Sequence, residues 1–302
     1  MALGHKDGRR PRSRAFQPSV DGRLETRVLL SGAAAQIRSQ TAAGGLAVIV
    51  TNTVGQKFYI SVTQGTIQAF PASNGRVSLV ANNTTSDTLL EINQLIPMHP
   101  IAKGAHTFNS ARGGGTGILN IAAIDITSGL INSIEGYHTA SLSGPLTVAG
   151  NEPVNRIALL NVLPGGSIAV GSDLDTLDIF NNADFSNSFG LYVGRDLNWL
   201  ETGGDLSFTN GANMYVVRGA GQTFQAPKGS GNAGQGIYVN GNLTIGSNDF
   251  IDIGTNVGPF GILINGSLTG PERLFLGGVP VTTSNPFGSY GFAVTVHGNV
   301  FP

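Results

Sequence analysis

The C-terminal two thirds of the chain repeat one pattern of apolar and polar positions. The pattern is an apolar residue, any residue, Val or Ile, a three-residue corner that holds a glycine, and usually Leu. The clearest copies are 237–243 and 262–268, and 168–174 and 191–197 fit the same frame. Successive Val or Ile positions lie 22 to 25 residues apart, with a last interval of 32. These central positions are 126, 148, 170, 193, 217, 239, 264 and 296. A fixed period in this range is the signature of a stacked repeat.

Alternation over three or four positions predicts strands with one buried face, and no helical period persists beyond a turn. Each unit of about 22 residues is expected to form one coil of two or three strands, with coils about 4.8 Å apart. The β-branched central positions are expected to form one column inside the stack. We expect the corner glycines to supply the positive φ that a sharp change of direction often needs. The pattern therefore predicts an all-β parallel β-helix (β-solenoid). A leucine-rich repeat is not favoured, because its Leu-x-x-Leu-x-Leu-x-x-Asn pattern is absent.

Three parts of the chain follow from this pattern. Residues 1–40 are expected to form a disordered basic export segment, 41–117 an N-terminal β cap with a loop, and 118–302 the solenoid. The cap should contain strands and a turn at Asn74-Gly75, because alternating apolar runs flank that dipeptide. These runs are 46–50, 58–62, 76–79 and 89–92. The long last interval indicates an insertion at 271–286.

The N-terminal segment has the order of a secretion signal. A basic run at 6–14 precedes a short apolar stretch rich in small residues at 28–35. Phe16-Gln-Pro18 and the later run Leu24-Glu25-Thr-Arg27-Val28-Leu29-Leu30-Ser31 resemble the N-terminal motif of many large planctomycete secreted and surface proteins. The Gly- and Asn-rich β-strand repeats behind it are similar to repeats in those proteins. The resemblance implies export to the cell surface or the extracellular space.

Composition narrows the functional classes. The 302 residues contain no cysteine, which excludes disulfides, thiolate nucleophiles and cysteine metal sites. Net charge is −1, but residues 1–40 hold 8 basic against 3 acidic residues, which leaves 17 − 8 = 9 basic and 18 − 3 = 15 acidic residues for 41–302. This mildly acidic body offers no electrostatic footprint for nucleic acid. No stretch approaches the roughly 18 apolar residues of a transmembrane helix. The five histidines show no metal-ligand spacing.

Acidic residues recur at the predicted corners. Stacking would place Asp173 and Asp196 roughly 5 Å apart, a separation that suits either a retaining glycosidase pair or a shared Ca²⁺. Asp175 is a further candidate calcium ligand, and the sequence implies no other cofactor. The alternative is that these aspartates are solvent-exposed turn residues, with Arg195 close enough to reduce their repulsion.

The residue between two inward positions faces outward. On four successive predicted coils it is Tyr192, Val216, Tyr238 and Leu263, which would form an apolar stripe on one sheet. Such a stripe is typical of a surface that binds glycans or surface proteins, although a loop of the same chain could also cover it.

The function expected from these observations is that of an exported, non-enzymatic β-solenoid. It would be a structural or adhesive cell-surface or matrix protein that presents an extended binding face. The alternative is a polysaccharide-active parallel β-helix, either a lyase or a glycoside hydrolase.

Overall fold

A computed structural model describes residues 38–41, 43–96, 109–110, 117–217, 219–220, 236–254, 261–277, 279–281 and 293–302. They belong to the unit Gly32–Pro302, and the account below concerns this unit alone. The predicted export motif lies outside the described residues, as does most of the predicted loop that ends the cap.

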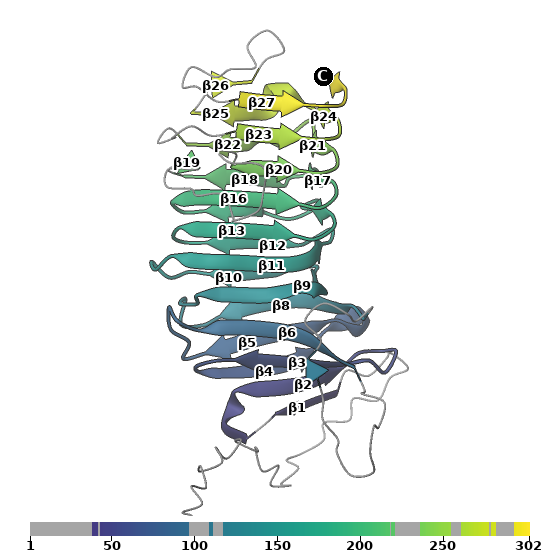
Figure 1. Ribbon diagram of the computed structural model, residues 1–302, viewed down its shortest axis with the longest axis vertical. Coiled ribbons are helices and arrows are strands. Elements are labelled where there is room, and N and C mark those ends of the chain that lie inside the picture. Colours follow the sequence, from purple (N-terminus) through teal and green to yellow (C-terminus); the bar gives the residue numbers. More distant parts are fainter. Residues whose placement is uncertain are drawn as a thin grey trace, which may run out of the picture. The chain divides into compact units, whose positions relative to one another are not determined.

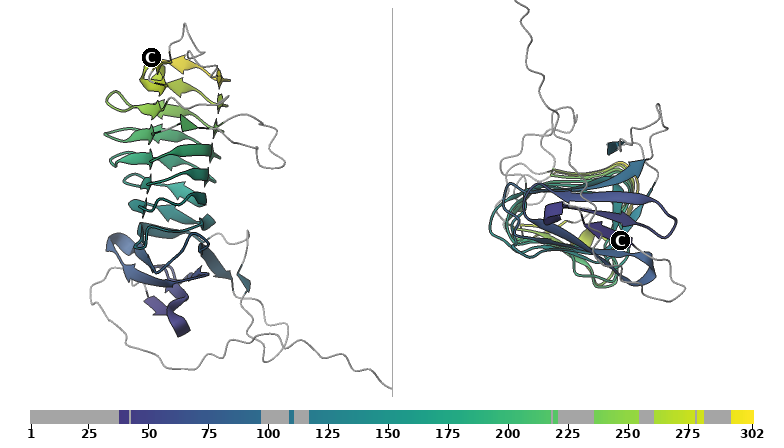
Figure 2. Two further views of the ribbon diagram at one scale, coloured as in Figure 1. Left: turned by 90° about the vertical axis from the view of Figure 1, so that its left-hand side faces the viewer. Right: turned by 90° about the horizontal axis from the view of Figure 1, so that it is seen from below.

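The predicted all-β parallel β-helix is confirmed. Successive coils pair through parallel strands and build three sheets, which we call sheets A, B and C (Figures 1 and 2). Each coil runs from sheet B to sheet A, then to sheet C, and back to sheet B. Sheet A consists of β6 (Leu89–Ile96), β9 (Ser133–Leu142), β11 (Val154–Val162), β13 (Leu174–Ile179), β16 (Asp196–Thr202), β20 (Ile237–Val239), β23 (Gly261–Ile264) and β27 (Ala293–Val296).

The other two sheets are built in the same way. Sheet B consists of β5 (Val77–Asn82), β8 (Leu119–Ile126), β10 (Pro145–Val148), β12 (Ser167–Val170), β15 (Gly190–Val193), β18 (Asn213–Val216), β22 (Ile251–Ile253) and β25 (Leu274–Leu276). Sheet C consists of the start of β8, the ends of β9 and β11, then β14 (Ala183–Asp184), β17 (Leu206–Phe208), β21 (Leu243–Ile245), β24 (Leu268–Thr269) and β28 (Val300–Phe301).

Aliphatic columns fill the inside of the stack. One column of sheet A contains Leu90, Ile134, Ile157, Leu177, Leu200, Ile237, Ile262 and Val294, each paired with the next. All but Val294 are fully buried or nearly so, and Val294 packs against the same core. Burying one such side chain contributes about 1.5–3 kcal/mol. In sheet C the rings of Phe185 and Phe208 stack in parallel with centroids 5.0 Å apart. The columns therefore hold the coils together.

The N-terminal end is antiparallel. Its further elements are β1 (Arg38–Thr41), η1 (Ala43–Gly45), β2 (Ala47–Thr51), β3 (Lys57–Val62), β4 (Thr66–Pro71), η2 (Ser73–Gly75) and β7 (Asn109–Ser110). The chain of pairings β1–β2–β3–β6 is antiparallel, as are β4–β5 and β6–β7. The predicted turn is present, since Asn74 (φ 59°) and Gly75 (φ 70°) lie between β4 and β5. Parallel stacking already begins at β5 and β6, and the cap boundary at 117 stays a prediction.

The prediction of a single central column is wrong. Positions 126, 148, 170 and 193 do follow one another in sheet B. The next coil places Val216 on Val193, whereas Val217 is 54% exposed. Val239, Ile264 and Val296 stack on one another in sheet A, where Val239 pairs with Thr202. The sequence pattern does not distinguish the column of sheet B from that of sheet A, because the chain leaves each of these sheets through a glycine corner that follows a β-branched residue.

From β8 onward, coil length varies mainly at one corner. Paired positions in this part of sheet B are 22 or 23 residues apart, except for the step from Met214 to Ile251, which takes 37. The earlier step from β5 to β8 takes 44 or 45 residues. Paired positions in sheet A are 44 residues apart between β6 and β9 and 20 to 37 apart from β9 onward, so a uniform coil of 22 residues is not seen. From β8 onward, the corner between sheets B and A, here the BA corner, takes up most of the difference. It holds three residues between β12 and β13 and twenty between β18 and β20, among them β19 (Gly219–Ala220).

The corner between sheets A and C, here the AC corner, is constant. Three residues separate the last inward residue of sheet A from the first residue of sheet C in each of five coils. These corners are 180–182, 203–205, 240–242, 265–267 and 297–299. A polar side chain in one corner accepts a hydrogen bond from the backbone of the next: Asp205 N donates to Asn182 Oδ1 (2.9 Å), Asn242 N to Asp205 Oδ1 (2.7 Å), Ser267 N to Asn242 Oδ1 (2.8 Å), and Asn299 N to Ser267 Oγ (3.1 Å).

The predicted insertion at 271–286 is wrong in its first part. Residues 271–273 form η3 (Pro271–Arg273), and β25 then pairs with β22 in sheet B. The following β26 (Val279–Pro280) pairs antiparallel with β25. Residues 282–292 lie outside the described part of the chain.

The corner glycines have a different cause from the one expected. Among the predicted corner glycines that the structure describes, only Gly129 has a positive φ (71°). Six of the others, Gly150, Gly171, Gly194, Gly241, Gly266 and Gly298, lie against the corner of the preceding coil. A Cβ on Gly266 would lie 2.5 Å from the carbonyl oxygen of Gly241, and one on Gly298 would lie 2.6 Å from that of Gly266. Close approach of backbone to backbone, rather than φ, requires glycine there.

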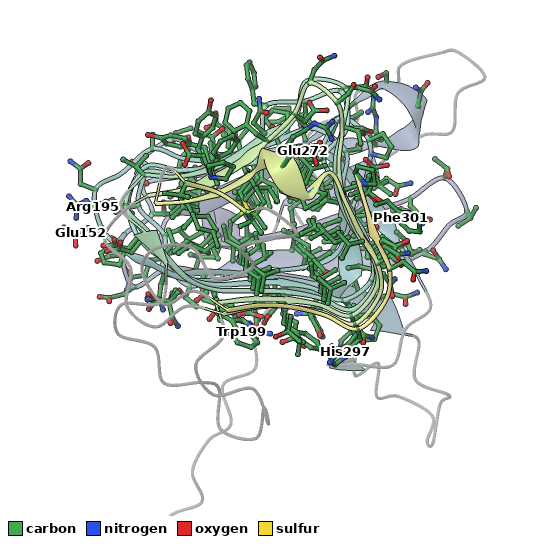
Figure 3. The ribbon with its side chains drawn as sticks, turned by 90° about the horizontal axis from the view of Figure 1, so that it is seen from above. Glu152, Arg195, Trp199, Glu272, His297 and Phe301 are labelled. Carbon is green, nitrogen blue, oxygen red and sulfur yellow. The ribbon has the colours of Figure 1, made fainter. Side chains whose placement is uncertain are left out.

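Figure 3 shows how the side chains divide between the inside and the outside of the coils. Carbon-rich side chains fill the interior, while Glu152 and Arg195 lie at the BA corner, Trp199 lies on the side of sheet A, and His297 lies at the AC corner. Within the part of the chain that the structure describes, no helix has the length and apolarity needed to span a membrane.

Candidate functional site

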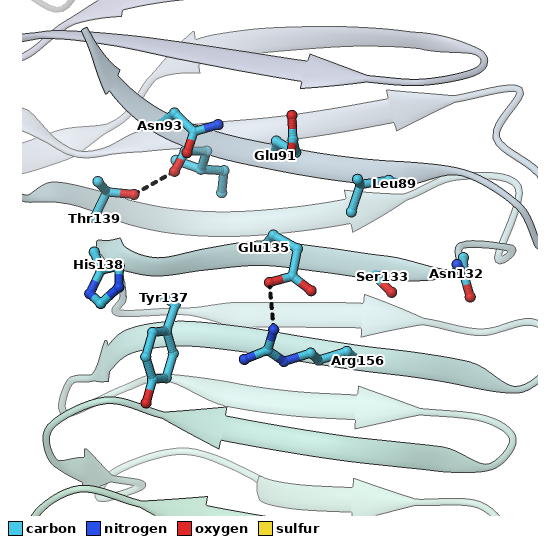
Figure 4. A pocket seen from close by; sticks show the side chains of 11 residues that line it. Leu89, Glu91, Asn93, Asn132, Ser133, Glu135, Tyr137, His138, Thr139 and Arg156 are labelled. Carbon is cyan, nitrogen blue, oxygen red and sulfur yellow. Dashed lines mark hydrogen bonds and ion pairs between the residues drawn. The ribbon is translucent and has the colours of Figure 1, made fainter. Parts of the chain in front are cut away.

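A bulge in sheet A creates the candidate site. Gly136 of β9 pairs with Leu159 of β11, but the next matched pair is Ser141 with Asn161, so residues 137–140 have no separate partners on β11. Bulges of this kind turn side chains away from their regular direction. The bulge borders an open hollow of about 560 Å³ (Figure 4). Its lining comprises Leu89, Glu91, Ile92, Asn93, Asn132, Ser133, Glu135, Tyr137, His138, Thr139 and Arg156.

Gly136 is required for this geometry. A Cβ on Gly136 would lie 2.5 Å from the Cβ of Ala140 across the bulge. The backbone is fixed further where Thr139 Oγ1 donates to the carbonyl oxygen of Ile92 at 2.5 Å. These two contacts fix the backbone of the bulge that borders the hollow.

Arg156 is the centre of charge in the site. Its Nε donates to Asp178 Oδ2 at 2.8 Å, its second terminal nitrogen lies 2.6 Å from the same oxygen, and its first lies 3.2 Å from Glu135 Oε2. Glu135, Ala158 and Asp178 occupy one outward row on β9, β11 and β13. Because Ala158 is small, the guanidinium can reach a carboxylate on each side of it.

Three aromatic rings lie beside the charged groups. The rings of Tyr137, His138 and Phe180 meet edge to face, with centroid distances of 4.9, 5.0 and 5.1 Å. Phe180 is 43% exposed, and the Arg156 guanidinium carbon lies 5.7 Å from the centroid of the Tyr137 ring. Exposed rings next to hydrogen-bonding groups are a common way to bind a ligand that has both apolar and polar faces.

A second pair of carboxylates continues the row. Asp178 pairs in register with Glu201 on β16, and Trp199 Nε1 donates to Glu201 Oε2 at 3.2 Å. Burial raises the pKa of Asp178, and Arg156 opposes that rise. Burial is also the main cause of the raised pKa of Glu201, against the hydrogen bond from Trp199. Both groups therefore hold a proton to a higher pH than ordinary carboxyl groups do.

The predicted carboxylate pair at the BA corner performs a structural task. Asp173 and Asp196 do lie on neighbouring coils, where Asp173 Oδ1 accepts a hydrogen bond from the backbone nitrogen of Asp196 at 3.1 Å. Arg195 lies 3.8 Å from Asp173, and Asp175 accepts a hydrogen bond from Asn198 at 2.7 Å. Among the described residues, no group of three His, Asp or Glu side chains is arranged to hold a metal ion. A catalytic or calcium-binding role of these aspartates stays a prediction.

The predicted apolar stripe is not continuous. Val216 faces the core and is 1% exposed, so its proposed outward position is wrong. The outward neighbour of Tyr192 is instead Tyr215, and both lie on sheet B. Tyr238 and Leu263 pair with each other on sheet A, above Glu201. The four positions therefore lie on two sheets, because the coil with 37 residues was assigned to the wrong frame.

Sequence reasoning missed most of the residues around the hollow. Arg156, Glu135 and Tyr137 lie in a part of the chain where the glycine frame marks no outward position, and the bulge leaves no simple periodic signal. The available signal was charge: alternate residues of 133–137 and 174–178 include acidic side chains inside strands, where they are uncommon.

The chain matches no protein-family model, no curated protein and no solved structure. Its class is therefore defined by its fold, a three-sided parallel β-helix, and by a charged and aromatic hollow on one of the three sheets.

Proposed function

We propose that the protein is an exported, non-enzymatic β-solenoid of the cell surface or matrix, which binds glycans on the outer face of sheet A. The main support for this proposal is the hollow at the β9 bulge, where exposed aromatic rings lie next to carboxylate, guanidinium and amide groups. A sugar ring presents C–H groups on its faces and hydroxyl groups around its edge. Aromatic rings complement the faces, and charged acceptors and donors complement the edge.

The stack supports this function as a scaffold. The site is carried by strands rather than by loops, and aliphatic columns fix those strands from behind. Binding therefore needs little ordering of the site, which keeps the entropic cost of association low.

Replacement of the exposed ring tests the proposal. Phe180→Ser should weaken binding to a glycan array by about fivefold or more, because a ring contact of this kind contributes roughly 1 kcal/mol. Phe189→Ser is the matched control, because Phe189 is an exposed ring on another corner, 92% accessible. Equal losses in the two variants, or no binding of the wild-type protein to any glycan, would contradict the proposal.

The location has its own test. Fractionation of cells that express the full chain should place it outside the cell, as the resemblance of the N-terminal motif implies. Retention inside the cell would contradict the export part of the proposal.

One observation favours an enzyme as the second candidate. Asp178 and Glu201 are register partners on adjacent strands, so their backbones lie about 4.8 Å apart, and burial raises both pKa values. Retaining glycosidases use two carboxyl groups about 5–5.5 Å apart, one of them protonated as a general acid.

An activity screen separates the two candidates. Under the enzyme candidate, the wild-type protein releases reducing sugars from a bound glycan, and Glu201→Gln abolishes the release without loss of binding. Asp252→Asn, which changes an outward carboxylate of sheet B, serves as the control. Binding without any release would leave the non-enzymatic proposal standing alone.

A further inference from the structure

The hollow at the β9 bulge is longer along the strands than along the stack. One side of its lining follows the chain from Asn132 to Tyr137, and the other follows β6 from Leu89 onward. Five steps of about 3.3 Å separate Asn132 from Tyr137, which gives a length of about 17 Å. In the other direction the lining crosses from β6 over β9 to Arg156 on β11, two steps of about 4.8 Å, or about 10 Å. Asn132 and Tyr137 lie near opposite ends of the hollow in Figure 4.

The floor of the hollow is straight up to the bulge. Residues 133–136 of β9 pair in register with 156–159 of β11, and the first three of them pair with 89–91 of β6. The inward side chains of Leu90 and Ile134 are fully buried behind this floor and hold it in place. A ligand that is itself extended can follow a straight, rigid floor without ordering the protein, which keeps the entropic cost of binding low.

The groups along the floor change from one end to the other. At one end the rings of Tyr137 and Phe180 meet edge to face, and Phe180 is 43% exposed. In the middle a terminal nitrogen of Arg156 lies 3.2 Å from Glu135 Oε2, so N–H donors and a carboxylate lie side by side. The amide of Asn132 lies at the other end. One sugar unit can therefore pack on the rings while the next units form hydrogen bonds with the charged pair and the amide.

We infer that this hollow binds a linear β-1,4-linked chain of glucose-type sugars, with about three units laid along the strands and therefore across the stack. This inference rests on the proposed glycan-binding function and adds the linkage class and the direction of the ligand. β-1,4 links between sugars with equatorial hydroxyl groups keep the chain extended and leave C–H groups on both faces of each ring. α-1,4 links curve a chain of the same sugars away from a straight floor.

Calorimetric titration of the full-length protein tests the linkage and the length. The probes are β-1,4-linked glucose oligomers of two to six units and α-1,4-linked glucose oligomers of the same lengths. Affinity for the β-linked series should rise about fivefold or more from two to three units and change less than about twofold from four to six. The α-linked hexamer should bind at least about fivefold more weakly than the β-linked hexamer. Equal or tighter binding of the α-linked hexamer would overturn the linkage class, and a steady rise in affinity up to six units would overturn the length.

Two variants locate the ends of the bound chain. Phe180→Ser should weaken the β-linked dimer and tetramer alike by about fivefold, because both pack on the rings. Asn132→Ala should weaken the tetramer about threefold to fivefold and leave the dimer unchanged, because a dimer on the rings does not reach Asn132. Asn120→Ala, which removes an exposed amide on sheet C, is the matched control and should change neither affinity. Equal losses for dimer and tetramer in Asn132→Ala would overturn the assignment of that end.

A third variant tests the direction of the chain. Outward from the hollow along the stack, Asp178 pairs in register with Glu201, and Glu201 with Tyr238. A sugar chain that ran along the stack would reach Tyr238, whereas a chain across the stack does not. Tyr238→Ser should therefore leave the affinity for the β-linked hexamer unchanged, and a loss of about fivefold or more would overturn the crosswise direction.

The outcomes also separate this inference from the function on which it rests. If the protein binds another glycan on an array but none of the β-1,4-linked glucose oligomers, the inference fails and glycan binding stands. If no glycan binds, the proposed function and the inference both fail.

Discussion

Replacing Gly266 tests the explanation of the corner glycines. Gly266 N donates to Gly241 O at 2.8 Å, and a Cβ on Gly266 would lie 2.5 Å from that same oxygen. Real side chains rarely come closer than about 3.4 Å to such an atom. The corners of the two coils would have to separate by about 1 Å. The pairing of β20 with β23, which precede these corners, opposes that separation. Overpacking of this kind costs about 1–3 kcal/mol.

A second glycine separates the two possible causes. Gly55 has a φ of 85°, and a Cβ there would have nothing within 4 Å. Gly55→Ala should therefore cost about 1–2 kcal/mol through the left-handed backbone alone, and Gly55→Asn should cost less, because Asn tolerates that conformation. At Gly266 the order should reverse, because the larger Asn side chain increases the clash.

Chemical denaturation of the four variants measures this reversal. Trp199 is the single tryptophan, it is fully buried on β16, and its fluorescence reports the unfolding of the stack. A Gly266→Ala variant with the wild-type midpoint, or a Gly266→Asn variant more stable than Gly266→Ala, would refute the explanation by close approach.

Three further substitutions test other parts of the structure. Glu201→Gln should flatten the pH dependence of stability: because burial raises the folded-state pKa, the contribution of Glu201 is present below its ordinary 4.5 and is lost as pH rises through the raised value. As pH rises from 4, the denaturation midpoint of the wild-type protein should therefore fall relative to that of Glu201→Gln. A constant difference between the two midpoints across this pH range would contradict the prediction. Asp205→Ala removes the acceptor of two hydrogen bonds from Asn242 and should lower the free energy of unfolding by about 1 kcal/mol. Asp205→Asn keeps an acceptor oxygen and should lower it less. Equal losses in the two variants would contradict the role of that oxygen. Phe208→Ala opens a cavity in the sheet C stack and should cost about 3–5 kcal/mol in the same denaturation assay, and a cost below about 1 kcal/mol would show that the ring is not a core residue.

The fold could be predicted from local sequence because stacking requires the same residue types at equivalent positions of every coil. An inward β-branched residue followed by a glycine corner appears at 168–171 and at 262–266 for the same reason, close contact with the preceding coil. The pattern could not say which of two corners a given copy belongs to. The pattern consequently predicts Val216 outside and Val217 inside, the reverse of the structure.

The candidate site could be predicted only in part. The outward direction of Tyr192 and Tyr238 follows from strand alternation and agrees with their partial exposure. The hollow depends on a bulge at Gly136 and on Arg156 reaching across Ala158 to two other coils. These contacts join residues about one coil apart in the sequence, and no local spacing rule contains them.

The two corners that flank sheet A differ in freedom. The AC corner keeps three residues in each of five coils and carries a ladder of backbone and side-chain hydrogen bonds, while the BA corner ranges from two residues, between β15 and β16, to twenty. Chain length can thus change at the BA corner without shifting the register of any column, and the entropic cost of a longer loop rises only slowly with its length. Evolution, or a protein engineer, can therefore attach new segments along one margin of sheet A while the opposite margin keeps the coils aligned.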